Sequence, residues 1–428
     1  MVHDLGVAEE LAQDALVAAL EQWPGSGVPR NPGAWLMTTA KRRAIDQIRR
    51  NETYARKLRL LGHELETEQR TAAGADGTVA SVASVDAGAG GADGAVIEDD
   101  LLRLVFIACH PVLSREARVA LTLRLLGGLT TDEIARAFLV AESTVAQRIV
   151  RAKRTLAKEK VPFEVPEGPE LGRRLASVLE VVYLIFNEGY SATAGEDWMR
   201  PGLCEDAVRL GRVLAGLLPG EPEVHGLVAL LEIQASRVPA RTAGPGRAPV
   251  LLLDQDRTRW DQLLIRRGFA ALARADAAAR ERGEPPGSYA LQAAVAVCHA
   301  RAVRAEDTDW ERIVALYDLL AARDPSPVVQ LNRAVAVSMW RGPEEALALV
   351  ERLAAESPAL RDYHLLPSVR GDLLSRTGRY GEAAEEFGRA AGLTRNGAES
   401  AFLLERAEGA ASAGAAAGRG DRERPGGR

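Results

Sequence analysis

Apolar residues recur at helical spacing along most of the chain, and this pattern predicts an all-α fold. Near the start, the segment from Ala8 to Trp23 has one apolar face and one acidic face, and the following segment, 31–59, has a strongly basic face. From Glu167 onward we expect almost continuous helices, which are interrupted where Pro and Gly cluster. These clusters lie at 201–202, 219–222, 239–249 and 283–287.

The run from Leu129 to Leu156 combines a short acidic helix with a second helix that ends in alternating Arg and Lys. This is the layout of a helix-turn-helix, which places one helix in the major groove of DNA. Leu139 stands at the turn, where such motifs usually carry Gly, so we expect a turn of different shape. Each helix has an apolar stripe that can pack against its neighbour, formed by Ile134, Ala135 and Phe138 in the first and by Val145, Ile149 and Leu156 in the second.

The other side of the second helix carries the candidate DNA contacts. Ser143 or Thr144 can cap this helix and offer amide groups to a phosphate. Gln147 and Arg148 stand where side chains reach base edges. The alternative interpretation is an amphipathic hairpin with a solvated basic face. A basic tail suited to phosphates follows and includes Arg151, Lys153 and Arg154.

A second basic segment lies upstream, within residues 31–59. Its apolar positions, among them Trp35, indicate one amphipathic helix that begins near Pro32. Only Asp46 and Glu52 oppose the positive charge of its other face, which therefore suits phosphates. This basic stripe consists of Lys41, Arg42, Arg43, Arg49, Arg50, Arg56, Lys57 and Arg59.

Residues 7–59 and 98–160 resemble domains two and four of a bacterial extracytoplasmic-function (ECF) sigma factor in order, spacing and helix character. The segment CHPVLSREARVALTLRLLGGLTTDEIARAFLV, residues 109–140, is similar to the group of these factors that carries a long C-terminal helical extension. The resemblance implies a protein that is not an enzyme and needs no cofactor or metal. It would bind core RNA polymerase, recognise the minus-ten and minus-thirty-five promoter elements and promote DNA opening.

Carried over to this chain, the resemblance assigns roles to individual residues. Asn31 and Trp35 would capture a flipped base of the minus-ten element, although a core aromatic is an equal alternative for Trp35. Lys41, Arg42, Arg43, Arg49 and Arg50 would hold the separating strands. Glu10, Gln13 and Asp14 would dock on the clamp helices of the largest polymerase subunit. The minus-thirty-five contacts would be Ser143, Thr144, Gln147, Arg148, Arg151, Lys153 and Arg154.

Composition and the resemblance together predict the domain boundaries. Residues 71–95 consist almost entirely of Ala, Gly, Ser, Val and Asp, which indicates a flexible linker. Domain two of the family includes one more helix before the segment that begins at Ala8, so we expect the start codon to be assigned too late. The predicted parts are a truncated domain two (1–66), a linker (67–97), domain four (98–162), a helical extension (168–300), repeats (301–410) and a disordered tail (411–428).

Three segments near the C-terminus share a pattern of apolar positions and begin at Arg312, Glu345 and Glu382. Their spacings of 33 and 37 residues are close to the tetratricopeptide (TPR) period of about 34 residues. Such repeats leave concave grooves for peptides. We therefore expect a TPR-like, regulatory extension whose partner is a peptide or, from the resemblance, a small YCII-like (DGPF) protein. The alternative is an irregular helical bundle.

The charge distribution and the absence of targeting, membrane, metal and catalytic motifs limit the classes of protein that fit this sequence. The net charge is -5, yet residues 114–160 carry ten basic and five acidic side chains, so positive charge gathers in the proposed DNA-binding part. Cys109, Cys204 and Cys298 lie far apart and are expected to be buried thiols. We find no secretion signal, membrane-spanning run, metal motif or catalytic motif, and expect a cytoplasmic protein. Two alternatives remain: a stand-alone helix-turn-helix regulator with a TPR-like sensing domain, and a helical scaffold or enzyme.

Overall fold

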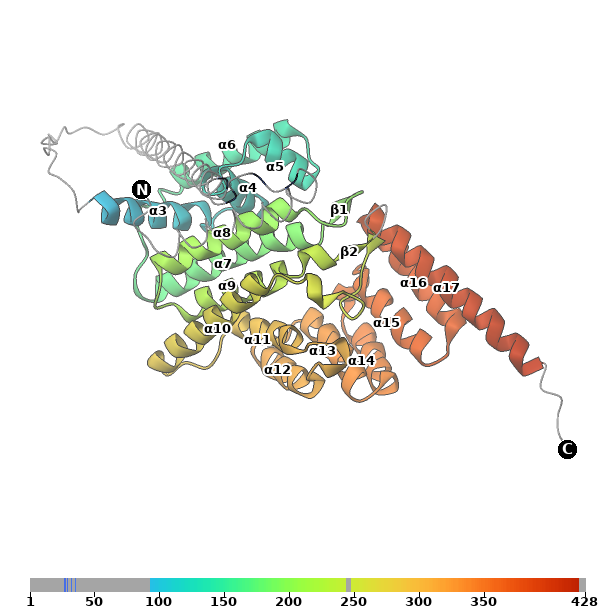
Figure 1. Ribbon diagram of the computed structural model, residues 1–428. Helices are drawn as coiled ribbons and strands as arrows, with labels where there is room; N and C mark the ends of the chain where they lie inside the picture. Colours follow the sequence, from blue (N-terminus) through green and yellow to red (C-terminus); the bar gives the residue numbers. More distant parts are fainter. Residues whose placement is uncertain are drawn as a thin grey trace, which may run out of the picture. The chain divides into compact units, whose positions relative to one another are not determined.

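Helices make up most of the described part of the chain. The computed structural model describes residues 93–243 and 248–422, together with residues 27, 29, 32 and 35. Strands in these residues are limited to two-residue segments, so the predicted all-α class is confirmed (Figure 1). The chain divides into two compact units, and residues 105–152 and 164–428 belong to the second.

The first described helices are α3 (Asp93–Ala108), α4 (Arg115–Leu125), α5 (Thr131–Phe138) and α6 (Glu142–Lys158). α3 begins at Asp93, so the last residues of the segment expected to be a linker, 67–97, are helical. The rest of that segment lies outside the described residues. The side chain of Ser114 caps α4 by accepting a hydrogen bond from the amide of Ala117 (3.3 Å), and α4 then packs against α5 and α7.

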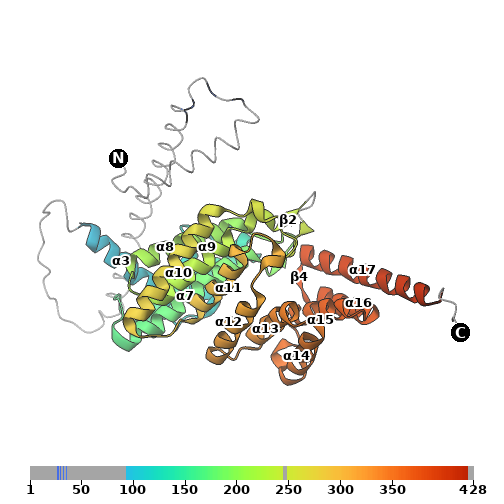
Figure 2. The ribbon, with the colours of Figure 1, turned by 60° about the horizontal axis from the view of Figure 1, so that its bottom comes forward.

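The following helices pack around α9. They are α7 (Gly168–Tyr190), α8 (Pro201–Leu217), α9 (Pro222–Ala235), α10 (Gln262–Arg282) and α11 (Ser288–Arg301) (Figure 2). α9 packs against α8, α10 and α11, which explains why it is apolar on nearly all sides and why Leu227 and Leu231 are fully buried. The predicted Pro and Gly breaks are confirmed, since Pro201 and Pro222 begin helices and Gly283 ends α10 in the left-handed conformation.

Short elements connect these helices. β1 (Ala194–Gly195) pairs in parallel with β4 (Arg395–Asn396), which joins two segments far apart in the sequence. β2 (Thr242–Ala243) pairs antiparallel with β3 (Ala248–Pro249). The 3-10 helices are η1 (Val238–Ala240), η2 (Arg257–Arg259), η3 (Ala305–Asp307) and η4 (Pro358–Leu360).

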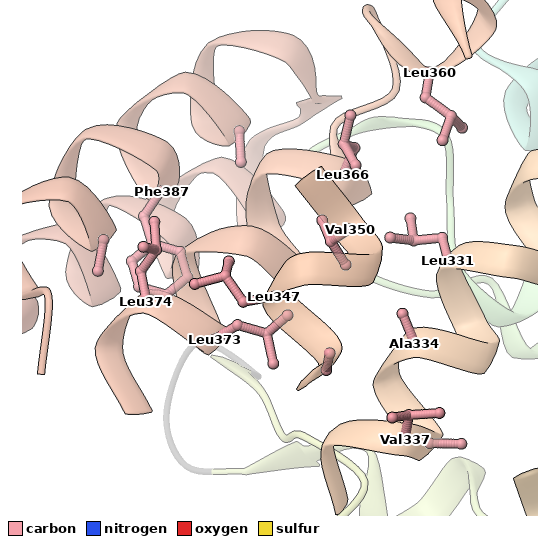
Figure 3. Close-up of a cluster of buried hydrophobic side chains, with 14 of the residues drawn as sticks. Leu331, Ala334, Val337, Leu347, Val350, Leu360, Leu366, Leu373, Leu374 and Phe387 are labelled. Carbon is pink, nitrogen blue, oxygen red and sulfur yellow. The ribbon is translucent and has the colours of Figure 1, made fainter. Parts of the chain in front are cut away.

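Stacked helix pairs form the C-terminal region. The pairs are α12 (Trp310–Arg323) with α13 (Pro327–Trp340), α14 (Pro343–Glu356) with α15 (Leu365–Arg376), and α16 (Tyr380–Leu393) with α17 (Gly397–Arg422). The three repeated segments of the sequence lie on the first helix of each pair. Their equivalent residues Ile313, Ala346 and Ala383 are at most 1% exposed. They belong to one apolar cluster that also holds Leu331 and Phe387 (Figure 3).

The C-terminal helix α17 extends further than expected. It runs from Gly397 to Arg422, so most of the segment predicted to be a disordered tail, 411–428, is helical. The sequence from Ala407 to Ala417 is rich in Ala, which has the highest intrinsic helix propensity. Gly414, in the same stretch, packs closely on Tyr380 of α16.

Candidate nucleic-acid interface

A reciprocal cap fixes the start of the short helix α5. The Thr130 hydroxyl accepts a hydrogen bond from the amide of Glu133 (3.1 Å), and the Glu133 carboxylate accepts one from the amide of Thr130 (2.7 Å). The hydrogen bond from the Thr130 amide also lowers the pKa of Glu133. Ile134 and Ala135 are buried as predicted, so the acidic side of α5 faces outward.

Leu139 ends α5 in the left-handed region, with φ 50° and ψ 45°. The next amide, that of Val140, donates to the carbonyl oxygen of Ala135 (3.0 Å), as it does in a helix that ends at glycine. The prediction of a differently shaped turn is therefore wrong. Leu139 adopts the glycine conformation, which costs a residue with a side chain roughly 1–2 kcal/mol.

The recognition helix α6 has one buried stripe and one outward stripe. Val145, Ala152 and Leu156 form the buried stripe and are at most 2% exposed, whereas Ile149, which was predicted for this stripe, is half-buried. Thr144, Arg148 and Lys153 are half-buried. The exposed outward face, as we call it below, consists of Ser143, Ala146, Gln147, Val150, Arg151 and Arg154. The candidates predicted for this helix therefore lie on one face or beside it.

The arginines of α6 are not neutralised by the described part of the chain. Arg148, Arg151 and Arg154 form no ion pair with any described residue. On α5, by contrast, Arg136 pairs with Asp132 at 2.8 Å. Because the charge on α6 is left free and exposed, this helix suits a polyanion such as duplex DNA.

Two predictions about α6 need correction or addition. Ser143 and Thr144 do not cap the helix, because α6 begins at Glu142 and the amide of Thr144 already donates to Ala141 (2.9 Å). Sequence reasoning also missed Ala146 and Val150, which are exposed on the outward face. Their spacing of three and seven residues from Ser143 was the available signal.

The helix-turn-helix segment docks on the helices that follow it in the chain. Glu180 of α7 accepts hydrogen bonds from Arg115 (2.6 Å) and Arg118 (3.1 Å) of α4, and Ser177 donates to the carbonyl oxygen of Cys109 (2.5 Å). These contacts use α4 and leave the outward face of α6 exposed. Two further side chains donate to backbone oxygens of this segment, Arg174 to Phe106 (3.1 Å) and Arg209 to Gly127 (3.1 Å).

Three family models match the chain. Residues 103–156, which contain the helix-turn-helix, match Sigma-70, region 4. Residues 1–53 match Sigma-70 region 2. The chain belongs to the ECF-type sigma factors. It carries in addition a C-terminal domain whose residues 174–276 match a family of unknown function, DUF6596.

A known protein shares this whole arrangement with the sigma factor. Uncharacterized protein R00370 of Rhizobium meliloti (strain 1021) is 44% identical to it over 403 residues, which cover 94% of the chain and 89% of that relative. No solved structure matches the sigma factor. Its two sigma domains make it a non-enzymatic factor that binds core RNA polymerase and promoter DNA in transcription initiation.

The region 2 candidates lie almost entirely outside the described residues. Trp35 is described: it is half-buried and helical, which fits both a core aromatic and a stacking platform. Pro32, three residues earlier, is helical and exposed. The candidates outside the described residues are Glu10, Gln13, Asp14, Asn31, Lys41, Arg42, Arg43, Arg49 and Arg50.

The cysteines of the sigma factor are structural. Cys109, Cys204 and Cys298 are free and buried, as predicted. Burial raises the pKa of Cys109 to about 12 and that of Cys204 to about 12, so both thiols stay protonated and unreactive at neutral pH. In the described ranges, no helix has the length and apolar character needed to cross a membrane.

Gly189 and Asp261 of the extension have structural explanations. α7 ends at Tyr190, one residue after Gly189. A Cβ atom at Gly189 would lie 2.7 Å from the backbone nitrogen of Cys204, so glycine is needed where α7 approaches α8. Asp261 caps α10 by accepting hydrogen bonds from the amides of Leu263 and Leu264.

Proposed function

We propose that the outward face of α6 recognises the minus-thirty-five element of promoters. Gln147 and Arg148 would contact base edges, while Arg151, Lys153 and Arg154 would contact phosphates. The observation that carries this proposal is the exposed row of arginines without ion pairs on the helix that belongs to the region 4 match. The first turn of α6 would offer the amide of Ser143 to a phosphate, since the amide of Thr144 already donates to Ala141.

For region 2 we propose recognition and opening of the minus-ten element. Asn31 and Trp35 would hold a flipped base, and the basic residues from Lys41 to Arg50 would bind the separated strands. Glu10, Gln13 and Asp14 would contact the largest polymerase subunit. The match of residues 1–53 to Sigma-70 region 2 supports these roles, which stay predictions for the individual residues.

The extension would regulate the factor through region 4. Support comes from its direct docking on the region 4 segment. Glu180 accepts hydrogen bonds from α4, Arg174 and Ser177 donate to the end of α3, and Arg209 donates to the turn before α5. Stacked helix pairs of this kind offer surfaces for a peptide or protein ligand. The TPR-like character of these pairs and a partner among small YCII-like proteins stay predictions.

Run-off transcription with purified core polymerase and the full chain tests the proposed role of α6. The template is a promoter selected by the holoenzyme from a library randomised upstream. Replacing Gln147 and Arg148 by Ala should change which upstream sequences are preferred, because base-edge contacts are lost. The control is Gln262→Ala with Arg266→Ala, an exposed pair on α10. Unchanged upstream preference in the first variant would refute the assignment.

The regulatory role is tested by disconnecting the extension without removing it. Glu180→Ala deletes the acceptor shared by Arg115 and Arg118. We expect transcription from the same promoter to change while binding to core polymerase does not. Glu170→Ala is the matched control, because Glu170 forms its ion pair with Arg173 of the same helix, at 2.6 Å. Equal transcription by both variants would contradict regulation through this contact.

A further inference from the structure

The loop between α7 and α8, residues 191–200, is held firmly from within the extension. Glu188 at the end of α7 forms a nearly buried ion pair with Arg200, and the hydroxyl of Thr193 donates to the same carboxylate (2.8 Å). Arg200 also donates to the carbonyl oxygen of Ala194 (2.7 Å). These hydrogen bonds give the loop a defined conformation, so a residue that contacts the loop contacts a rigid surface.

One side of this loop receives the helix-turn-helix. A Cβ atom at Gly195 would lie 2.6 Å from Cδ1 of Leu139, which is closer than the contact distance of two non-bonded carbon atoms. The Leu139 side chain therefore rests on the glycine backbone. Leu139 is the residue that ends α5 in the left-handed conformation, so the contact lies at the turn from which α6 begins, although 53% of Leu139 stays exposed.

The C-terminal helices hold the same loop from another part of the chain. β1 pairs with β4, and the 1% exposed side chain of Asn396 donates to the carbonyl oxygens of Ala192 (3.0 Å) and Asp197 (2.8 Å). The side-chain oxygen Oδ1 of Asn396 accepts a hydrogen bond from the backbone amide of Glu399 (3.0 Å), so this side chain lies at the start of α17. Asn396 thus joins the last helix pair to the loop.

We propose that loop 191–200 is a relay in which Gly195 positions the recognition helix through Leu139, and Asn396 makes that position depend on the pair α16–α17. Three facts converge on it. The turn is strained where the side chain of Leu139 meets the loop, glycine is required at the point of contact, and the buried amide of Asn396 links the loop to the last helix pair. This inference rests on the proposed role of α6 and names the route by which the extension affects it.

Through this relay, a partner bound at the pair α16–α17 would affect DNA recognition without covering the outward face of α6. The outward face of α6 is exposed while Leu139 contacts Gly195, so this contact does not block the DNA-binding face. It acts on the angle at which α6 leaves the turn. A small displacement of this kind is sufficient, since base-edge contacts tolerate little misplacement.

The first test separates positioning from folding with substitutions at the contact. Leu139→Gly places the usual residue at the turn and removes the side chain that rests on Gly195, so the thermal stability of the full chain should not fall. Holoenzyme affinity for a duplex carrying the selected upstream element should nevertheless fall roughly fivefold or more. Unchanged affinity in this variant would overturn the proposal.

Gly195→Ala approaches the contact from the other side, by introducing the clash with Leu139. Its backbone strain at φ +100° is matched by the control Gly342→Ala, where φ is +107° and the nearest atom is a carboxylate oxygen of Glu344 at 3.3 Å. We expect loss of upstream affinity only in Gly195→Ala. Adding Leu139→Gly should then have no further effect, because either change removes the same contact. An equal loss in the Gly342 control, or additive losses in the double variant, would count against the contact.

The second test addresses the link to α17. Asn396→Ser keeps an oxygen that can cap α17 but removes the two hydrogen bonds to the loop. It should lower upstream affinity in the wild-type background and have no further effect once Leu139 is Gly, because both changes break one chain of contacts. Additive effects would overturn the relay. If the wild-type holoenzyme itself does not distinguish the selected element from a scrambled one, the proposed function fails instead.

Discussion

Arginine is used differently in the recognition helix and in the C-terminal extension. Several exposed arginines of the extension meet carboxylates, as in the pairs Arg282 with Glu221 (2.7 Å) and Arg379 with Glu382 (2.6 Å), while others, such as Arg266, make no ion pair with described residues. On α6, Arg151 and Arg154 are exposed and also make no ion pair with described residues. What sets α6 apart is that these two arginines lie three residues apart on one exposed face of a single helix, which suits a row of phosphates.

The two regions also differ in what stabilises them. The helix pairs are held by an apolar cluster with Phe387 among its fully buried members, whereas the outward face of α6 contributes no buried side chain. Substitutions in the first region should therefore lower stability, and substitutions in the second should lower DNA affinity alone. The predictions below test this division, beginning with the largest expected effect.

Phe387→Ala should produce the largest loss of stability. The side chain is 2% exposed, and its ring lies so close to Gly371 of α15 that a Cβ atom there would be 2.9 Å away. Removing a buried Phe costs roughly 3–5 kcal/mol because a cavity remains. Urea unfolding of the full chain measures this loss. Leu404→Ala on α17 is the control, since Leu404 is 50% exposed. A loss no greater than that of the control would show that this cluster does not hold the pairs together.

Acid should weaken the extension through His299. Burial, followed by the charges of Arg237 and Arg257, lowers the pKa of His299 to about 3, whereas an unfolded histidine titrates near 6.5. Between these values the unfolded chain binds the proton and the folded chain does not, so stability is complete above about pH 6.5 and falls as the pH drops. The expected loss from pH 7 to pH 4 is roughly 3 kcal/mol.

The variant His299→Phe isolates this residue from the other titrating groups. It keeps an aromatic ring beside Trp310, whose centroid lies 5.2 Å from that of His299, and it cannot bind a proton. Its free energy of unfolding should therefore fall less steeply with acid than that of the wild type. Parallel pH profiles for the two proteins would mean that His299 titrates normally in the folded state.

The sequence predictions that succeeded depended on the spacing of residues within single helices or short segments. The burial of Val145 and Leu156 on α6 and of the repeated positions Ile313, Ala346 and Ala383 follows from spacing along one helix, and the structure confirms it. The ECF sigma assignment depended on the same local segments and is also confirmed.

Contacts between distant segments explain the failures. The conformation of Leu139 is tolerated while its side chain rests on Gly195, and no pattern near residue 139 reveals a glycine 56 positions later. The role of Gly189 likewise depends on the approach of Cys204. The helical end of α17 was also missed, although the alanines of this stretch favour a helix. The roles of the region 2 residues stay predictions.

Arg151→Ala with Arg154→Ala tests the free charge directly. Each phosphate contact that is lost should reduce the slope of log affinity against log salt by about 0.9. We therefore expect weaker binding of the holoenzyme to all upstream duplexes, a shallower salt dependence and unchanged thermal stability. Arg379→Ala, which removes a paired arginine of the extension, is the matched control and should leave the salt dependence unaltered. If both variants shift the slope equally, the contrast between the two regions is wrong.

Val150 should have the smallest effect and the most specific one. It is 46% exposed on the outward face between Gln147 and Arg154, where a free apolar group can contact the methyl group of thymine in the major groove. Val150→Ser should cost about 1 kcal/mol in affinity for the selected element. In a further experiment, each thymine of that element is replaced by uracil in turn, which removes its methyl group. For the wild type, the replacement at one position should lower affinity as much as Val150→Ser does. For the variant, the replacement at that position should not lower affinity. If no thymine behaves in this way, Val150 faces a sugar or solvent, and recognition depends on the polar residues of α6 alone.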